Sequence, residues 1–306
     1  MDSITHALAA FLVFSPFATG AVLVSAVLGA VLPDSDIVMR RLSDRDPRLF
    51  VFSHGGFTHS LAGAAALGAG VALGFLGERT VSGQAPVGPV LVGIVFLASL
   101  AGALTHQFLD VLAVPGIPLL YPASCRKVSV GIFPGPRFVL FAASTLFLVV
   151  WLMGYGSSDG LHTYAVLGGL FILAHGVLKV AATRKFGKRA IPTVNPLTWL
   201  VIRDTGSAWH VSRAGLLSPR GEERIYEKNA GIDPDVLDSC ERDPRVRRLR
   251  YYSYIVVAER RGDDILLRDP LREDGYIFFP PHYTRVIIPG KGKMNTEREN
   301  HAFKGY

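Results

Sequence analysis

Cysteine is scarce in this sequence, and so is charge. The 306-residue chain has two cysteines, Cys125 and Cys240, which lie far apart and share no spacing typical of a metal site. Two such residues make no disulfide framework, and free thiols in a reducing compartment are the expected state. Charged residues make up 19% of the chain, below the usual ~25%. This low share argues against an ordinary soluble enzyme.

Several common functional motifs are also missing. The sequence has no Walker motif, no dinucleotide fingerprint and no serine nucleophile elbow, and nothing in it directs a prediction toward nucleic acid. Apolar residues, in contrast, make up 49% of the chain, and the mean hydropathy is +0.32. These figures exclude intrinsic disorder and collagen-like or coiled-coil fibres.

The charges are unevenly distributed along the chain. Up to Ala182 there are 9 Lys+Arg and 8 Asp+Glu, whereas the remaining 124 residues hold 23 and 17. Nearly all of the net charge of +7 therefore lies in the C-terminal part. We predict a helical membrane domain over residues 1–191 and a soluble domain over residues 192–306, with Pro192–Pro196 as the linker.

Four long apolar runs have the length of a bilayer-spanning helix, which needs ~20 mostly apolar residues. They are Thr58–Gly77, Val87–Leu112, Phe138–Gly154 and Leu161–Leu178. Buried helices of a soluble protein would not be expected to follow one another in this way. The sequence therefore predicts four membrane spans.

The N-terminal stretch Ile4–Leu32 is apolar but is interrupted by Ser15-Pro16 and by Gly20. Proline inside a helix removes a hydrogen bond and kinks or breaks it. Two interpretations remain open, a single kinked span or a hairpin of two short helical arms, Ile4–Phe14 and Ala21–Leu32. The site residues discussed below favour the hairpin.

The loops between the runs alternate between basic and non-basic. Basic residues gather after Leu32, after Leu112 and after Ala182, whereas Glu78–Pro86 has one and Tyr155–Gly160 has none. By the positive-inside rule, the basic loops and the long tail are expected in the cytoplasm. We therefore expect a multi-pass protein of the cell membrane, in contact with membrane lipids.

The tail has the texture of a small β-rich domain. Segments rich in β-branched and aromatic residues are bounded by turn-forming residues. The expected strands are Arg250–Ala258, Ile265–Leu267, Tyr276–Phe279 and Thr284–Ile288. The predicted fold class is mainly α, a polytopic helical membrane domain with an N-terminal helical hairpin, followed by a small β-containing cytoplasmic domain.

Ionisable residues recur at one end of the predicted spans, where they are costly to bury and indicate function. They are His6, Asp34, Asp36, His54, His59, His106 and Asp110. His106 and Asp110, four residues apart, face one way on a helix. His6 joins the others only if the N-terminal stretch folds back as a hairpin, because a single helix would place it about 40 Å away.

Mixed imidazole and carboxylate ligands suit zinc, and also manganese or iron. We predict that all seven residues bind metal, and that Asp34 or Asp36 orients a metal-activated water or acts as general base. Two alternatives remain open for these residues. One is a structural buried pair between His106 and Asp110, and the other is a proton relay or ion pathway.

Four motifs, taken in order, resemble a known family. MDSITHALAAF, LGAVLPDSD, HGGFTHSL and LTHQFLDVL are similar to the YdjM-like family of membrane-bound, metal-dependent hydrolases. That family is grouped with zinc-dependent phospholipase C and the single-strand-specific zinc nucleases. The resemblance implies a helical metal site and phosphoester hydrolysis. The family usually has arginine where this chain has Gly55.

The sequence thus leads to two functional hypotheses. The first is a metal-dependent hydrolase at the cytoplasmic membrane face, acting on a phosphoester substrate that includes lipids as candidates, with zinc as the expected metal and manganese as the alternative. The second is a non-catalytic membrane protein with a structural metal site and a partner-binding tail. The sequence names neither the substrate nor the oligomeric state.

Overall fold

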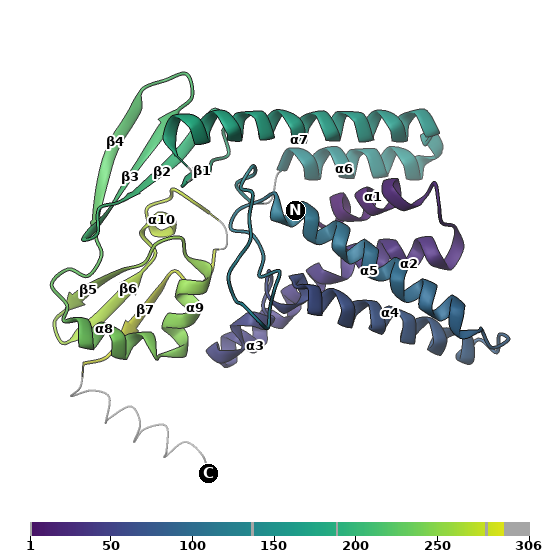
Figure 1. The fold of residues 1–306 in the computed structure, drawn as a ribbon, viewed down its shortest axis with the longest axis horizontal. Coiled ribbons are helices and arrows are strands. Elements are labelled where there is room, and N and C mark those ends of the chain that lie inside the picture. Colours follow the sequence, from purple (N-terminus) through teal and green to yellow (C-terminus); the bar gives the residue numbers. More distant parts are fainter. Residues whose placement is uncertain (1, 136–137, 188, 279–280, 291–306) are drawn as a thin grey trace, which may run out of the picture. The chain divides into compact units, whose positions relative to one another are not determined.

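The computed structural model describes residues 2–135, 138–187, 189–278 and 281–290. The chain divides into two compact units, Met1–Ala182 and Thr183–Tyr306 (Figure 1). The first unit is helical and the second contains two antiparallel sheets. This confirms the predicted mainly α fold class with a β-containing C-terminal part.

The first unit begins with the predicted helical hairpin. Helix α1 (Ser3–Phe14) and helix α2 (Gly20–Val31) pack against each other and are joined by a short turn (Figure 1). The Asp2 side chain caps α1 by accepting from the backbone N–H of Thr5 at 2.9 Å. Gly20 adopts φ 55°, a left-handed conformation that glycine tolerates and that lets the chain reverse.

The second arm of the hairpin extends further than predicted. After α2 the chain continues as a 3₁₀ helix, η1 (Leu32–Met39), and as helix α3 (Arg40–Arg45). Pro33 lies in the first turn of η1, and the change from α2 to the 3₁₀ helix occurs there, so the chain remains helical instead of forming a loop. The resulting run Gly20–Arg45 is itself long and apolar enough to cross a membrane.

The four predicted spans are confirmed as helices. They are α4 (Leu61–Val81), α5 (Pro89–Val111), α6 (Phe138–Val150) continued by the π-helical turn η4 (Trp151–Tyr155), and α7 (Ser158–Phe186). With Gly20–Arg45, the described residues thus contain five helices able to span a bilayer by length and composition. Two short 3₁₀ helices, η2 (Pro47–Phe52) and η3 (Phe57–His59), connect α3 to α4.

Helices α2 and α5 approach each other closely because glycines lie between them. A Cβ atom on Gly102 would lie 1.8 Å from the carbonyl oxygen of Ala26, and one on Gly29 would lie 1.9 Å from that of Ser99. Small residues at such contacts are typical of helices that pack in membranes. The close packing brings the C-terminal ends of α2 and α5 together, where the candidate site lies.

The second unit is built on two meanders. Strands β1 (Ala190–Pro192), β2 (Thr198–Asp204), β3 (Ala208–Gly215) and β4 (Arg220–Glu227) pair in sequence order, as do β5 (Val257–Arg261), β6 (Asp264–Arg268) and β7 (Arg285–Ile288). Helices α8 (Pro234–Glu241) and α9 (Pro244–Tyr252) connect the sheets, and α10 (Pro270–Glu273) follows β6.

The structure corrects several details predicted for the tail. Arg250–Tyr252 belongs to α9 instead of a strand, because Asp243 and Pro244 start a capped helix there. Residues 276–278 are not in a strand, and Phe279 lies outside the described residues. The segment Pro192–Pro196, expected as a linker, begins in β1 and connects it to β2. Strands β1–β4 were not predicted.

Candidate metal centre

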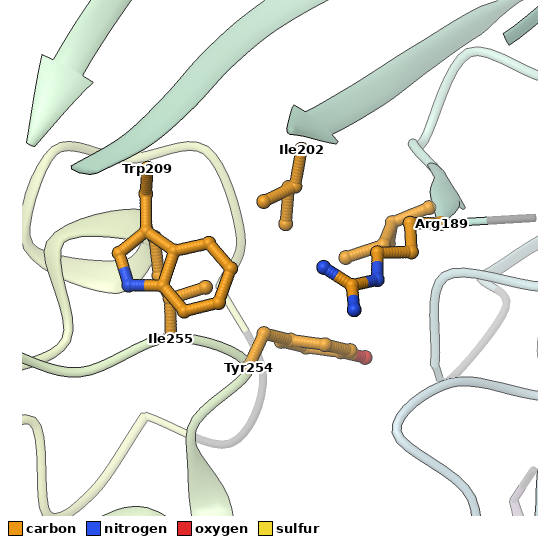
Figure 2. A pocket seen from close by; sticks show the side chains of 6 residues that line it. Arg189, Ile202, Trp209, Tyr254 and Ile255 are labelled. Carbon is orange, nitrogen blue, oxygen red and sulfur yellow. The ribbon is translucent and has the colours of Figure 1, made fainter. Parts of the chain in front are cut away.

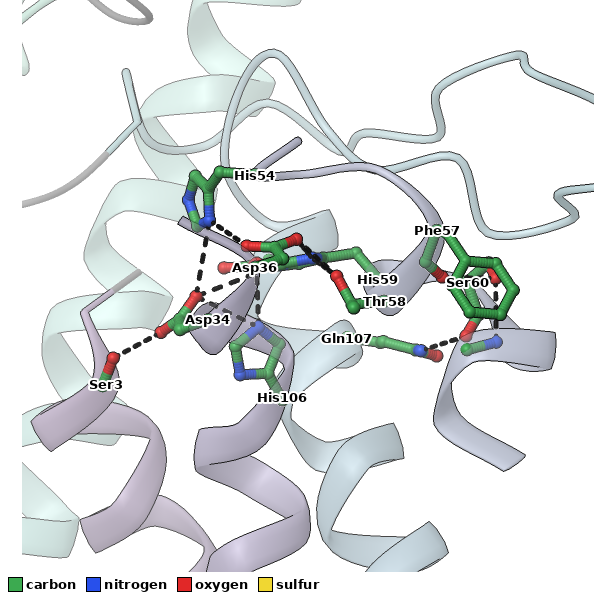
Figure 3. A network of polar contacts seen from close by, with 12 residues as sticks. Ser3, Asp34, Asp36, His54, Phe57, Thr58, His59, Ser60, His106 and Gln107 are labelled. Carbon is green, nitrogen blue, oxygen red and sulfur yellow. Dashed lines mark hydrogen bonds and ion pairs between the residues drawn. The ribbon is translucent and has the colours of Figure 1, made fainter. Parts of the chain in front are cut away.

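The seven candidate ligands come together at one end of the helical unit. Helix α1 contributes His6, η1 contributes Asp34 and Asp36, and α5 contributes His106 and Asp110; His54 precedes η3, which contributes His59. Figure 3 shows Asp34, Asp36, His54, His59 and His106 pointing toward one another from separate elements. The hairpin returns the chain to its starting face, which is why His6 belongs to the group.

Two imidazoles and two carboxylates form the centre of the cluster. His59 Nε2 lies 3.6 Å from Asp34 Oδ1 and 3.4 Å from Asp110 Oδ2. His106 Nε2 lies 3.7 Å and 3.2 Å from the same two oxygens. Both histidine side chains are fully buried. Each of these two imidazole nitrogens thus lies within 3.7 Å of both carboxylate oxygens, and the four atoms come from three elements.

The hydrogen bond of His106 fixes which of its ring nitrogens carries the proton. Its Nδ1 lies 2.7 Å from the carbonyl oxygen of Ala30, which can only accept, so Nδ1 carries the proton and donates. In the neutral ring Nε2 then presents a lone pair toward two carboxylate oxygens. A lone pair facing carboxylates is repulsive unless a cation or a proton lies between them.

Several atoms at this point are buried without a hydrogen-bond partner among the described residues. They are both ring nitrogens of His6, Asp34 Oδ1, and the Nε2 atoms of His59 and His106. A buried polar group without a partner costs free energy, and a cluster of such groups calls for an explanation. Three groups of side chains have atoms close enough to hold a metal ion: His6–Asp34–His106, Asp34–His54–His59 and His59–His106–Asp110.

His6 packs on the far side of His106. The two rings stack with centroids 3.7 Å apart, and His6 Nε2 lies 3.3 Å from Asp110 Oδ1. Asp110 therefore has one oxygen toward His6 and the other toward His59 and His106. A carboxylate in this position can bridge two metal ions.

Asp36 holds two of the histidines from behind. It is fully buried, accepts a short hydrogen bond from the Thr58 hydroxyl, and lies 2.9 Å from His54 Nδ1 and 3.2 Å from His59 Nδ1. In His59, whose Nε2 faces Asp34 and Asp110, the second ring nitrogen is therefore oriented by a carboxylate, as is common for metal-binding histidines. Asp36 is in none of the three groups of potential ligands.

His54 lies at the opening of the cluster. Its side chain is 33% exposed, whereas the other three histidines of the cluster are buried, and its Nδ1 lies 3.9 Å from Asp34 Oδ1. The next residue, Gly55, adopts φ 75°, and a Cβ there would meet no atom within 4 Å. A molecule reaching the cluster from solvent would meet His54 first.

The effect of the carboxylates on a neighbouring group is clearest at His59, the last residue of η3, which lies outside the membrane-spanning helices. Burial disfavours its charged form, but its contacts with Asp34 and Asp36 outweigh burial and raise its pKa to about 9. The carboxylates thus stabilise positive charge at this point. The same field favours a bound cation.

Sequence reasoning missed the supporting residues. Ser3 donates to Asp34 Oδ2 at 2.7 Å, Thr58 donates to Asp36, and Gln107 donates to the carbonyl oxygen of Ser60 at 2.7 Å. Thr58 and Gln107 each directly adjoin a candidate histidine in the sequence. Their position beside His59 and His106 could have identified Thr58 and Gln107 as supporting residues.

A comparison with protein-family models gives one match. The model described as YdjM inner membrane protein matches residues 1–183, which includes every candidate ligand. This chain is a member of the YdjM inner membrane protein family. No curated protein and no solved structure matches the chain. The YdjM membership agrees with the five apolar helices and confirms a membrane protein.

Proposed function

We propose that this YdjM-family protein is a metal-dependent hydrolase that acts on phosphoesters, including those of lipids, at the cytoplasmic face of the membrane. The observation that carries the proposal is the convergence of the unpartnered atoms Asp34 Oδ1, His59 Nε2 and His106 Nε2 with Asp110 Oδ2. Buried groups of this chemistry repel one another unless a cation or a proton lies between them, and a divalent metal ion would supply that positive charge to all four atoms.

The donor set fits zinc. In a tetrahedral zinc site with ligand distances of about 2.0–2.2 Å, neighbouring ligand atoms are roughly 3.3–3.6 Å apart. The four nitrogen–oxygen distances among His59, His106, Asp34 and Asp110 are 3.2–3.7 Å. Manganese, which also accepts imidazole and carboxylate ligands, is the alternative. His6 and His54 extend the donor set on either side and provide for a second metal ion.

A bound divalent metal supplies a Lewis acid and a water of lowered pKa. Around it, each residue of the chain has a separate task. Asp34 Oδ2 is held by Ser3, which leaves Oδ1 to bind the metal or to accept a proton from water. Asp36 keeps His54 and His59 in place, so it is a positioning residue. The exposed edge of His54 faces the entering substrate.

The membrane orientation supports a cytoplasmic site. Arg40, Arg41, Arg45 and Arg48 follow Asp36 directly, and basic residues also mark the loop after α5 and the end of α7. By the positive-inside rule, these ends are expected in the cytoplasm. The metal cluster lies at the ends of α2 and α5 that lead into the first two of these basic segments. It would therefore meet cytoplasmic substrates or the headgroups of inner-leaflet lipids.

Turnover by purified protein tests the proposal. Protein loaded with zinc or manganese should hydrolyse a phosphodiester such as bis-p-nitrophenyl phosphate, or a phospholipid in mixed micelles. Asp110→Asn should abolish turnover, whereas Asp159→Asn, a matched change at an exposed carboxylate on α7, should leave it unchanged. A protein that binds metal stoichiometrically but hydrolyses none of these substrates would favour the alternative of a structural metal site.

A further inference from the structure

The C-terminal unit contains a cavity that the metal centre does not involve. Its volume is about 320 Å³, and it is lined by Arg189, Ile191, Ile202, Trp209, Tyr254 and Ile255. Ile191, Ile202 and Trp209 belong to β1, β2 and β3, Arg189 directly precedes β1, and Tyr254 and Ile255 lie between α9 and β5. The cavity thus lies where the first sheet meets the segment that leads into the second. Its size is at the lower end of small-molecule sites.

The two ends of the cavity differ in chemistry. Figure 2 shows the guanidinium of Arg189 and the hydroxyl of Tyr254 at one end, with Trp209 and Ile255 at the other. Ile191, Ile202 and Ile255 are buried and form apolar walls, and Trp209 adds an aromatic surface. A ligand that fits both ends has an apolar body and one polar group.

The polar end is suited to an anion. Arg189 Nη1 lies 3.8 Å from Asp204 Oδ2, but the other oxygen of Asp204 is held by Lys228 at 2.6 Å. The long Arg189–Asp204 distance leaves most of the guanidinium donors available to a ligand, and guanidinium binds carboxylate and phosphate in a planar, bidentate manner.

Tyr254 provides a second donor beside Arg189. Burial raises the pKa of Tyr254, so the phenol keeps its proton at neutral pH and can donate. No hydrogen bond from its hydroxyl is found within the described part of the chain. An oxyanion between the two groups would satisfy both.

We propose that this cavity binds a small organic anion with a flat apolar body. The anionic group pairs with Arg189 and accepts from the Tyr254 hydroxyl, and the apolar body lies between the isoleucines and Trp209. The volume of about 320 Å³ lies at the small end of small-molecule sites and favours a ligand of about the size of a bicyclic aromatic acid.

Calorimetry with two matched probes tests the proposal. Full-length protein in nanodiscs of zwitterionic lipid is titrated with 2-naphthoate and with the neutral 2-naphthylmethanol, and empty nanodiscs serve as the blank. We expect one naphthoate to bind per chain and the alcohol to bind at least about tenfold more weakly, because hydrogen bonds to a charged group are the stronger ones. Equal affinities for the two probes, or no binding of naphthoate, would overturn the proposal.

Three variants locate the anion. Arg189→Gln should weaken naphthoate binding on the order of tenfold, and Tyr254→Phe, which removes one oxygen, should weaken it a few-fold. Arg203→Gln on the neighbouring strand β2 is the matched control and should bind as the wild type does, because Arg203 pairs with Glu223 and does not line the cavity. Circular dichroism checks that each variant is folded. If Arg189→Gln does not fold, Tyr254→Phe decides the outcome.

Anionic lipid in the nanodisc distinguishes a free ligand from a lipid headgroup. Replacing part of the zwitterionic lipid by phosphatidylglycerol should leave naphthoate affinity unchanged within a few-fold if the cavity takes a free small anion. If a lipid headgroup occupies the cavity instead, the wild-type protein should lose naphthoate binding in nanodiscs rich in phosphatidylglycerol and regain it as the share of phosphatidylglycerol is lowered. That result would overturn the proposal.

Discussion

The two units of this chain bury opposite kinds of side chain. In the helical unit the fully buried residues are mainly alanine, serine and histidine, while large apolar residues such as Leu73, which is 68% exposed, face outward. In the C-terminal unit Leu249, Leu267 and Leu271 are fully buried, and the charged side chains buried beside them, Asp269 and Arg272, pair with each other at 2.7 Å. The difference follows from the surroundings, because lipid is as apolar as leucine and gives no reason to bury it.

This contrast also explains why the candidate metal centre lies in the helical unit. A helix bundle that exposes its leucines to lipid has room inside for small and polar residues, and closely packed helices fix those residues rigidly. His6, His59 and His106 are fully buried in such a setting. The C-terminal unit, whose interior is filled by leucine, valine and isoleucine, has no comparable cluster of histidine and carboxylate among its described residues.

The largest expected effect is at the α2–α5 contact. Gly102→Leu would drive a side chain into the backbone of α2, where even the Cβ would be 1.8 Å from Ala26 O. We expect loss of the folded membrane unit and of its metal, because a backbone contact cannot yield as a side chain does. Thermal unfolding in detergent and metal analysis measure both. Gly93→Leu on the same helix, where a Cβ meets nothing within 4 Å, is the control and should stay folded.

The second effect is confined to the C-terminal unit. Leu267→Ala empties a fully buried position and should lower the free energy of unfolding by about 2–5 kcal/mol. Metal content should not change, since every candidate ligand lies in Met1–Ala182. Denaturant unfolding followed by tryptophan fluorescence measures the first quantity. Leu217 is exposed, so an equal decrease in the free energy of unfolding for Leu217→Ala would argue against the buried core described for this unit.

A smaller effect is expected at the residue behind the metal centre. Asp36→Asn keeps the shape of the side chain but weakens its hold on His54 and His59, so metal affinity should fall about 10–100-fold. Competition with a chelating dye measures the affinity. Asp44→Asn, at an exposed carboxylate on α3, is the control. An unchanged affinity in Asp36→Asn would remove Asp36 from its proposed positioning role.

The smallest effect sharpens the comparison of the two units. Leu73→Ala is the same chemical change as Leu267→Ala, but Leu73 faces outward on α4. We expect a stability change of only a few tenths of a kcal/mol, about the insertion contribution of one leucine. Unfolding in detergent measures it. A loss as large as that of Leu267→Ala would mean that Leu73 packs against protein, and the account of the helical unit would need revision.

The sequence predicted the membrane part well because its signals are long and redundant. Each span is an uncharged run, and the breakers Ser15-Pro16 and Gly20 predicted the hairpin that the structure contains. The continuation of the second arm through Pro33 was missed, because proline in the first turn of a 3₁₀ helix does not end it. The histidines and aspartates of the cluster were found through their position at the span ends.

The C-terminal unit was predicted less well because its elements are short. Strand β4 is rich in charged residues, with Arg224 and Glu223 in its middle, so it lacks a clear alternating pattern. RYYSYIVVA combines the end of α9 with the start of β5, and its aromatic residues favoured a strand throughout. The helix is stabilised there because Leu249 and Tyr252 are buried in the core of the unit.

Metal analysis of the purified protein tests the central claim most directly. Wild-type protein, prepared with trace zinc and manganese present, should contain at least one tightly bound metal ion per chain, and X-ray absorption should show nitrogen and oxygen ligands only. His106→Ala should lose this metal, whereas His162→Ala, an exposed histidine on α7 whose Nδ1 bonds to Ser158 O, should retain it. A folded wild-type protein without stoichiometric metal, or a His106→Ala variant with wild-type metal content, would contradict the account.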